Sequence, residues 1–174
     1  HFLEPVSVWN EHLEPRWRDR IYYRDDAEPI ALADSQQQKR AGQLGDGGGP
    51  ARTTERLVID GHVTVLSGPG MRYSVGDSMT PHGLSAERRS NRRLEEAHPG
   101  GMSGSERLRV HDAEGIDAAV LFPSMGLLFG SISDPELALG ACQAVNRFAA
   151  DYCSAAPREL YSTAALPHQS PELA

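Results

Sequence analysis

The stretch SERLRVHDAEGIDAAVLFPSMG, from Ser105 to Gly126, has the pattern of a short helix, a glycine stop and a strand. Ser105 is a good N-cap residue, and Glu106 places an acid in the first turn, where the helix dipole favours negative charge. Gly115 stands where a left-handed residue would end the helix. The stretch therefore predicts a helix from Ser105 that stops at Gly115.

The run that follows this glycine, Ile116 to Phe122, is almost uninterruptedly apolar around a single acid, Asp117. A run of this length between Gly and Pro favours a strand covered on both faces, as in a parallel sheet. Pro123 lacks an amide hydrogen and should end the strand. Residues 124–133 would then leave its carboxyl end, where α/β proteins place ligands.

A second helix and a second strand are predicted further on. Asp134 fits an N-cap, with Pro135 at the first helical position and an acid after it. Apolar residues then recur at helical spacing up to Tyr152. Leu160 to Pro167 reads as another short buried strand, and His168 follows it. Strand, helix and strand make a βαβ unit, whose crossover should be right-handed.

Four segments of the chain resemble the amidohydrolase-related (amidohydrolase family 2) metal-dependent enzymes. They are the opening HFLEPVSVW, the central DAEGIDAAVLFPS and DPELAL, and the closing LYSTAALPHQSPELA. That family contains hydrolases and non-oxidative aromatic acid decarboxylases on (β/α)8 barrels. The resemblance implies an α/β fold, namely the amino-terminal part of a (β/α)8 TIM-type barrel. A complete barrel needs about 250 residues, so the 174-residue chain is expected to be a piece of a longer protein.

On this interpretation residues 1–174 form a partial metal-dependent hydrolase barrel domain. Residues from about 24 to 104 would be a glycine-rich excursion or lid after the first strand, and 105–174 the helix-strand-helix-strand of the barrel. Within the excursion, residues 57–66 predict a hairpin around Asp60-Gly61. Residues 6–20 have helical spacing interrupted by a proline, which indicates one amphipathic helix or two short ones.

The resemblance also implies site residues. His1 corresponds to the carboxyl end of the first barrel strand, which carries metal ligands in the family, so a divalent metal is expected there, zinc first and manganese as the alternative. Many members carry a second ligand two residues away, on either side along the strand, because residues i and i+2 of a strand point to the same face. Here the residue two after His1 is Leu3, so the His-x-His version is absent, while the version with an acid two residues before the histidine stays open. Glu4 is a candidate for a substrate or second-shell role, or for a loop cap. His168 is a candidate substrate or second-shell contact.

Other polar residues receive structural interpretations. His62 lies at the hairpin tip and is expected to be exposed, and His82 and His98 are expected in surface loops. His111 and Asp112 resemble a dyad on paper, but helix neighbours point about 100° apart, so His111 is assigned with Arg107 and Arg109 to the outer face of the helix. The family takes its remaining histidine and aspartate from later strands, so the catalytic acid or base is unknown.

The composition of the chain indicates which classes of binding partner can be excluded. A net charge of −7 and a pI near 5.5 argue against a nucleic-acid surface. No run approaches the roughly 18 apolar residues of a membrane span, and no signal peptide is visible. Cys142 and Cys153 lie 11 positions apart on one predicted helix, about 16 Å, too far to bridge. Reduced cysteines indicate a cytoplasmic setting.

The leading hypothesis is a metal-dependent hydrolase that acts on a small, aromatic or carboxylate-bearing substrate by metal-activated water. One alternative is a non-oxidative decarboxylase of the same family. The absent His-x-His pair slightly favours a decarboxylase-like arrangement or an atypical single-metal site. Another is a non-catalytic, barrel-derived binding protein, and a third is a different barrel enzyme such as a sugar isomerase. The expected partners are a small-molecule substrate and, as in many family members, further copies of the chain.

Overall fold

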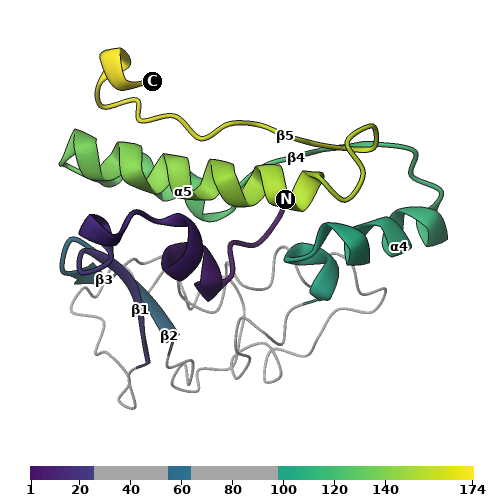
Figure 1. Ribbon diagram of the computed structural model, residues 1–174, viewed down its shortest axis with the longest axis horizontal. Helices are drawn as coiled ribbons and strands as arrows, with labels where there is room; N and C mark the ends of the chain where they lie inside the picture. The colour runs from purple at the N-terminus through teal and green to yellow at the C-terminus, as the bar shows by residue number, and fades with distance from the viewer. Residues whose placement is uncertain (26–54, 64–97) are drawn as a thin grey trace, which may run out of the picture.

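The computed structural model describes residues 1–25, 55–63 and 98–174 of the chain, and it shows a mixed α/β arrangement (Figure 1). In chain order the elements are η1 (Val8–His12), η2 (Pro15–Trp17), β1 (Ile21–Asp25), β2 (Glu55–Ile59), β3 (His62–Val63), η6 (Pro99–Gly101), α4 (Gly104–Glu114), β4 (Ala119–Leu121), η7 (Met125–Ser131), α5 (Pro135–Cys153), β5 (Leu160–Ser162) and η8 (Pro171–Leu173).

The predicted βαβ unit is present as β4, α5 and β5. The two strands are parallel, with Ala119 opposite Leu160 and Leu121 opposite Ser162. On the other side of β4, Phe2 forms a parallel bridge with Pro123. Three parallel segments therefore lie in the order of the chain, with β4 in the middle and α5 alongside β4 and β5 (Figure 1).

Both strands of this unit are shorter than predicted, three residues each instead of seven and eight. The two strands pair over residues 119–121 and 160–162. One further hydrogen bond joins the Thr163 N–H to the Leu121 carbonyl. Beyond it the chain turns into the loops that follow each strand. The apolar runs identified the right segments but not their ends.

Helix α5 forms for the reasons that its sequence suggests. The Asp134 side chain accepts hydrogen bonds from the N–H groups of Glu136 at 3.0 Å and Leu137 at 3.4 Å. These contacts satisfy donors that a helix start leaves free. The apolar side of α5 lies in the main hydrophobic core, whose α5 members are Leu137, Ala138, Ala141, Cys142, Ala144, Val145, Phe148, Ala149 and Tyr152.

Helix α4 ends where predicted but begins earlier. Gly115 adopts φ 68° and ψ 38°, the left-handed C-terminal conformation. The N-cap is Ser103 rather than Ser105, and its hydroxyl accepts from the Glu106 N–H at 3.5 Å. A Cβ at Gly104 would lie 2.0 Å from the Tyr152 carbonyl oxygen. The helix start therefore packs so closely on α5 that only glycine fits there.

The hairpin is confirmed and belongs to a three-stranded antiparallel sheet, β1-β2-β3. Asp60 has φ 52° and Gly61 φ 78°, as a type I′ turn requires. Strand β1 pairs with β2 over five residues and was not predicted. Arg20 joins this sheet to α5, because it bonds to Asp60 at 2.9 Å and to Asp134 at 2.7 Å.

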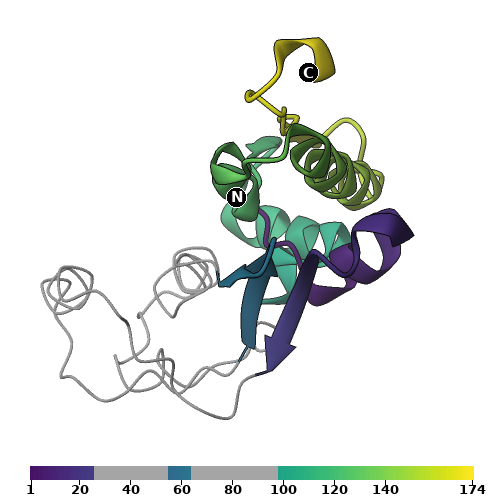
Figure 2. The ribbon, with the colours of Figure 1, turned by 90° about the vertical axis from the view of Figure 1, so that its left-hand side faces the viewer.

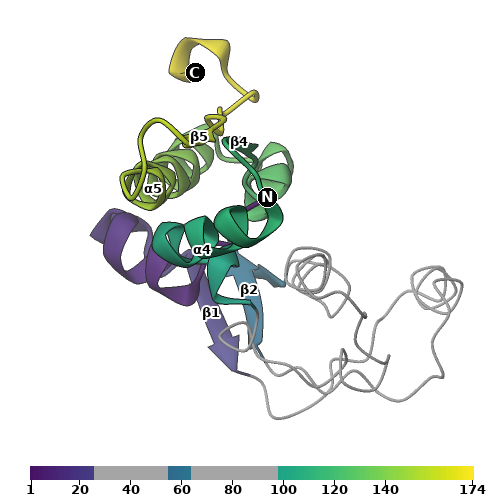
Figure 3. The same ribbon diagram turned by 90° about the vertical axis from the view of Figure 1, so that its right-hand side faces the viewer.

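The layers are clear in the two end views. In Figures 2 and 3 the β1-β2-β3 sheet lies on one side, the β4 and β5 strands lie on the other, and α4, α5 and η1 lie between them. Residues 6–20 form two short helical segments, the second alternative that the sequence left open. The predictions for the glycine-rich excursion, the lid and His82 concern residues 26–54 and 64–97, which lie outside the described residues.

Candidate functional site

His1 lies at the carboxyl end of the parallel strands. The Phe2 N–H donates to the Phe122 carbonyl at 3.1 Å, one residue past β4. The Phe2 ring is buried against Phe148 and Tyr152 of α5, at 5.7 and 5.9 Å between ring centroids. Since neighbouring strand residues point to opposite faces, His1 points away from α5. Its imidazole is exposed and lies 5.8 Å from the Phe122 ring.

One face of the parallel strands is open, which corrects the prediction that both faces are covered. Leu121 and Leu160 are buried beneath α5. On the opposite face Val120 is 59% exposed, Phe122 49% and Tyr161 48%. The apolar run in β4 therefore supplies a core face and an exposed face, and His1 lies beside Phe122 on the exposed one.

Glu4 is buried and bound to the loop that follows β4. Its Oε1 accepts from the N–H of Met125 at 2.8 Å and of Gly126 at 3.3 Å. Its Oε2 has no hydrogen-bond partner among the described residues. Burial raises the pKa of this carboxyl to about 7, against the lowering effect of the backbone N–H groups. With 1% exposure, Glu4 has the contacts of a loop cap, and its predicted substrate role stays a prediction.

His168 lies at the other end of the same loop. It is exposed, and a Cβ at Gly130 would lie 2.4 Å from its Nε2, so the imidazole rests on the glycine backbone. The next residue, Gln169, donates through Nε2 to the carbonyls of Phe129 and Ile132, the latter at 2.8 Å. The loops after β4 and β5 are thus joined, whereas Glu4 and His168 hold opposite ends of η7. Their predicted site roles stay predictions.

Three of the histidines that were assigned structural roles from the sequence lie among the described residues, and the structure agrees with the assignment to the surface for some of them but not for His111. His62 is exposed at the hairpin, and His98 caps η6 by accepting from the Gly100 N–H at 3.1 Å. His111 is a correction: it is 3% exposed, so it does not belong to the outer face of α4, and burial lowers its pKa. Within residues 1–25, 55–63 and 98–174, no three His, Cys, Asp or Glu side chains gather into a group that could hold a metal ion.

Arg107 was also assigned to the outer face of α4, and this is a second correction. It is partly buried, donates to the Tyr152 hydroxyl at 3.0 Å and donates to the His1 carbonyl at 2.6 Å. Nothing in the local sequence distinguishes it from Arg109, whose ion pair within the described residues is with its helix neighbour Glu106 at 3.3 Å. The difference between the two arginines comes from which one faces α5.

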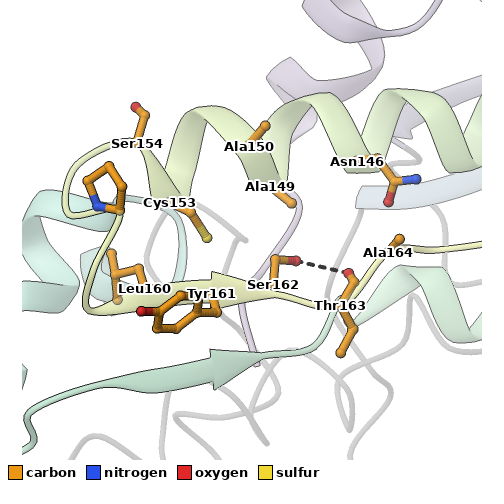
Figure 4. Close-up of a pocket in the computed structure, with 11 residues that line it drawn as sticks. Asn146, Ala149, Ala150, Cys153, Ser154, Leu160, Tyr161, Ser162, Thr163 and Ala164 are labelled. Carbon is orange, nitrogen blue, oxygen red and sulfur yellow. Dashed lines mark hydrogen bonds between the residues drawn. The ribbon is translucent and has the colours of Figure 1, made fainter.

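A groove of about 530 Å³ lies between the last turns of α5 and strand β5. Figure 4 shows Ala149 and Cys153 directed from α5 toward β5, and Ser162 donating to the Thr163 carbonyl at 2.9 Å. The Asn146 side chain makes two hydrogen bonds to the backbone of Ala165. Its Nδ2 donates to the Ala165 carbonyl at 2.9 Å, and its Oδ1 accepts from the Ala165 N–H at 2.8 Å. The groove lies on the α5 side of the strands and is lined by none of the predicted site residues.

The fold and site define a parallel α/β unit with an imidazole at the carboxyl end of its first strand. No protein-family model matches the chain, and no curated protein matches it. Among solved structures the chain is similar to an amidohydrolase from Mycobacterium avium subsp. paratuberculosis K-10, with 15% identity and a TM-score of 0.49. The match covers 94% of this chain and 40% of the amidohydrolase, so the chain spans less than half of the length of that protein.

Among the described residues, none of the helices combines the length and the apolar character that a membrane span requires.

Proposed function

We propose that the chain is the amino-terminal part of a metal-dependent hydrolase barrel of the amidohydrolase-related family, with His1 as a metal ligand. Its substrate would be a small molecule, aromatic or carboxylate-bearing, attacked by metal-activated water. The proposal rests first on the resemblance of the opening, central and closing words of the sequence. It is supported by three parallel segments in chain order, with a helix between the second and third.

One observation carries the proposal most directly. The His1 imidazole is exposed at the carboxyl end of the parallel strands, on the face away from α5. In α/β proteins this is the end at which ligands bind. A neutral imidazole at such a position suits zinc or manganese.

Among the described residues, the proposal assigns a single metal ligand, the His1 imidazole. His1 offers one nitrogen, while the Glu4 carboxylate is buried and engaged with the η7 backbone. The remaining ligands would come from outside the described residues. A bound divalent metal would act as a Lewis acid and lower the pKa of bound water. This chain would hold His1 in place and present the exposed ring of Phe122 beside it as an apolar wall.

Decarboxylation is the second candidate, and Leu3 favours it. Many family members carry a second ligand two residues from this histidine, but the residue two after His1 is Leu3, which is buried and faces Gly101, where a Cβ would lie 3.1 Å from the leucine Cδ1. The absence of a His-x-His pair slightly favours a decarboxylase-like arrangement or an atypical single-metal site. The same metal could then bind a substrate carboxylate instead of activating water.

The test is metal content, measured by mass spectrometry on the full-length protein. The wild type is compared with His1→Ala and with a matched control, His62→Ala, which removes an exposed histidine at the hairpin. We expect about one zinc or manganese per chain in the wild type and in the control, and loss of the metal in His1→Ala. Substrate panels for hydrolysis and decarboxylation then separate the two reactions. If all three proteins purify without metal and refuse added metal, the non-catalytic binding protein takes the place of the enzyme.

A further inference from the structure

Three elements meet at one guanidinium. Arg107, in the first turn of α4, donates through Nη2 to the His1 carbonyl at 2.6 Å and through Nε to the Tyr152 hydroxyl at 3.0 Å. Tyr152 belongs to the last turn of α5, and its side chain is buried. One side chain therefore spans α4, the end of α5 and the strand end that carries His1.

The Tyr152 hydroxyl extends this network. It accepts from Arg107 and donates its single proton to the Gly100 carbonyl at 2.5 Å. The next carbonyl, that of Gly101, accepts from the Leu3 N–H at 2.7 Å. The hydrogen bonds thus run from the His1 carbonyl through Arg107, Tyr152 and η6 back to the residue two after His1. They form a brace along one edge of the strand.

The other edge of the strand is held by β4 and its loop, but at a different residue. There the N–H of Phe2 donates to the Phe122 carbonyl, and the Phe2 carbonyl accepts from the Ser124 hydroxyl at 2.7 Å. Strand backbone groups alternate between the two edges. The His1 carbonyl therefore faces the Arg107 edge, where β4 gives it no support.

We propose that Arg107 is a positioning residue for His1: its guanidinium fixes the strand end so that the exposed imidazole is held ready for the metal. The inference rests on the proposed function, in which His1 is a ligand. Groups that orient a metal ligand commonly contribute about 10- to 100-fold to metal affinity. A charge-assisted hydrogen bond to the ligand's own backbone has the strength and direction for this task.

The test uses the full-length protein and four variants. Arg107→Met keeps the length of the side chain and removes both donors, and Tyr152→Phe removes one oxygen from the brace. Arg109→Met is the matched control, since Arg109 lies on the same helix, is mostly exposed and, in the part of the chain that the structure describes, pairs with Glu106 rather than with the strand end. His1→Ala tests the ligand itself. Zinc affinity is measured by competition with a chromophoric chelator, the ligand field by the visible spectrum of the cobalt-loaded protein, and folding by the Tm of the metal-free protein.

We expect Arg107→Met to weaken zinc binding by about 10- to 100-fold and to change the cobalt spectrum. Tyr152→Phe should change both in the same direction by less, and Arg109→Met should match the wild type. Zinc affinity and a cobalt spectrum like those of Arg109→Met in both brace variants would overturn the inference. Should Arg107→Met not fold, Tyr152→Phe alone decides. His1→Ala distinguishes failure of the proposed function from failure of the positioning role. If His1→Ala binds zinc as the wild type does, the proposed function fails. If His1→Ala loses zinc while Arg107→Met and Tyr152→Phe keep it, the positioning role of Arg107 fails.

Discussion

The carboxylate of Glu4 accepts a hydrogen bond from the Met125 N–H at 2.8 Å, across 121 positions of sequence. The contact joins the end of the first parallel segment to the loop that follows the second. A carboxylate at the start of η7 is well placed for the N–H groups there, yet its second oxygen is buried without a partner among the described residues. The loop is therefore positioned at the cost of a buried acid with a raised pKa.

This burial predicts an unusual dependence of stability on pH. Because the pKa of Glu4 rises on folding, to about 7 in the folded protein, its contribution is complete below about pH 4.5 and is lost as the pH rises to about 7. The loss is at most about 3 to 4 kcal/mol, since one pKa unit corresponds to about 1.4 kcal/mol. In the full-length protein, Glu4→Gln should show a smaller fall in Tm than the wild type between pH 5 and pH 8.

The control for this prediction is Glu114→Gln, which changes an exposed acid at the end of α4. It should keep the pH dependence of the wild type. Equal falls in Tm for the wild type and Glu4→Gln would mean that the Glu4 carboxyl is not the group responsible. The comparison uses differences between pH values, because glutamine itself leaves a buried donor at this position.

Gly115 offers a test of backbone conformation without a change in packing. Its φ of 68° is unfavourable for residues with a Cβ, and a Cβ there would meet nothing within 4 Å. Gly115→Ala should therefore destabilise the protein by about 1 kcal/mol through the left-handed conformation alone. Gly115→Asn should cost less, because asparagine tolerates this region better. Denaturant unfolding measures both, and equal costs would contradict the conformational explanation.

Features set by neighbouring residues could be predicted from the sequence. The Asp134 cap, the Gly115 stop and the Asp60-Gly61 turn each depend on the conformational preference of one or two residues, and all three are present. Strand β1 was not predicted, because its five residues become a strand by pairing with β2, about 30 positions later. Local patterns carry no information about such pairing.

The candidate site was less predictable for the same reason. The resemblance selected Glu4, but its burial under η7 depends on a loop more than 100 residues away. Arg107 and Arg109 look alike in sequence, and only the packing of α4 against α5 separates a brace of His1 from a surface ion pair. The one-sided exposure of β4 likewise depends on what covers the strands, which an apolar run does not reveal.

Asp134 has two roles that mutation can separate. It caps α5 and also bonds to Arg20, which links the hairpin sheet to the helix. Asp134→Ala removes both and should give the larger loss of stability. Asp134→Ser keeps a cap and loses the ion pair, so it should cost less, because the two side chains are 32% and 34% exposed and water screens the pair. Urea unfolding at low and high salt measures both, and a larger loss in the serine variant would reverse the assignment.

The open face of the parallel strands predicts how the 174-residue chain behaves when expressed alone. Val120 and Tyr161 lie opposite each other in the ladder, and Phe122 follows on the same face, all about half exposed. Parallel strands are normally covered on both faces, and an apolar patch of this kind promotes association. We expect the isolated chain to form oligomers or aggregates in light scattering after size exclusion.

Replacing the three face residues by Thr or Ser should shift that chain toward monomer. The matched control changes Ile116 and Leu166, which are exposed to a similar degree but lie outside β4 and β5, and it should leave the association unchanged. The physical reason is that, among the described residues, the strand face offers a continuous apolar surface next to strand edges. A wild-type chain that is monomeric and unfolds cooperatively would show that the face needs no cover.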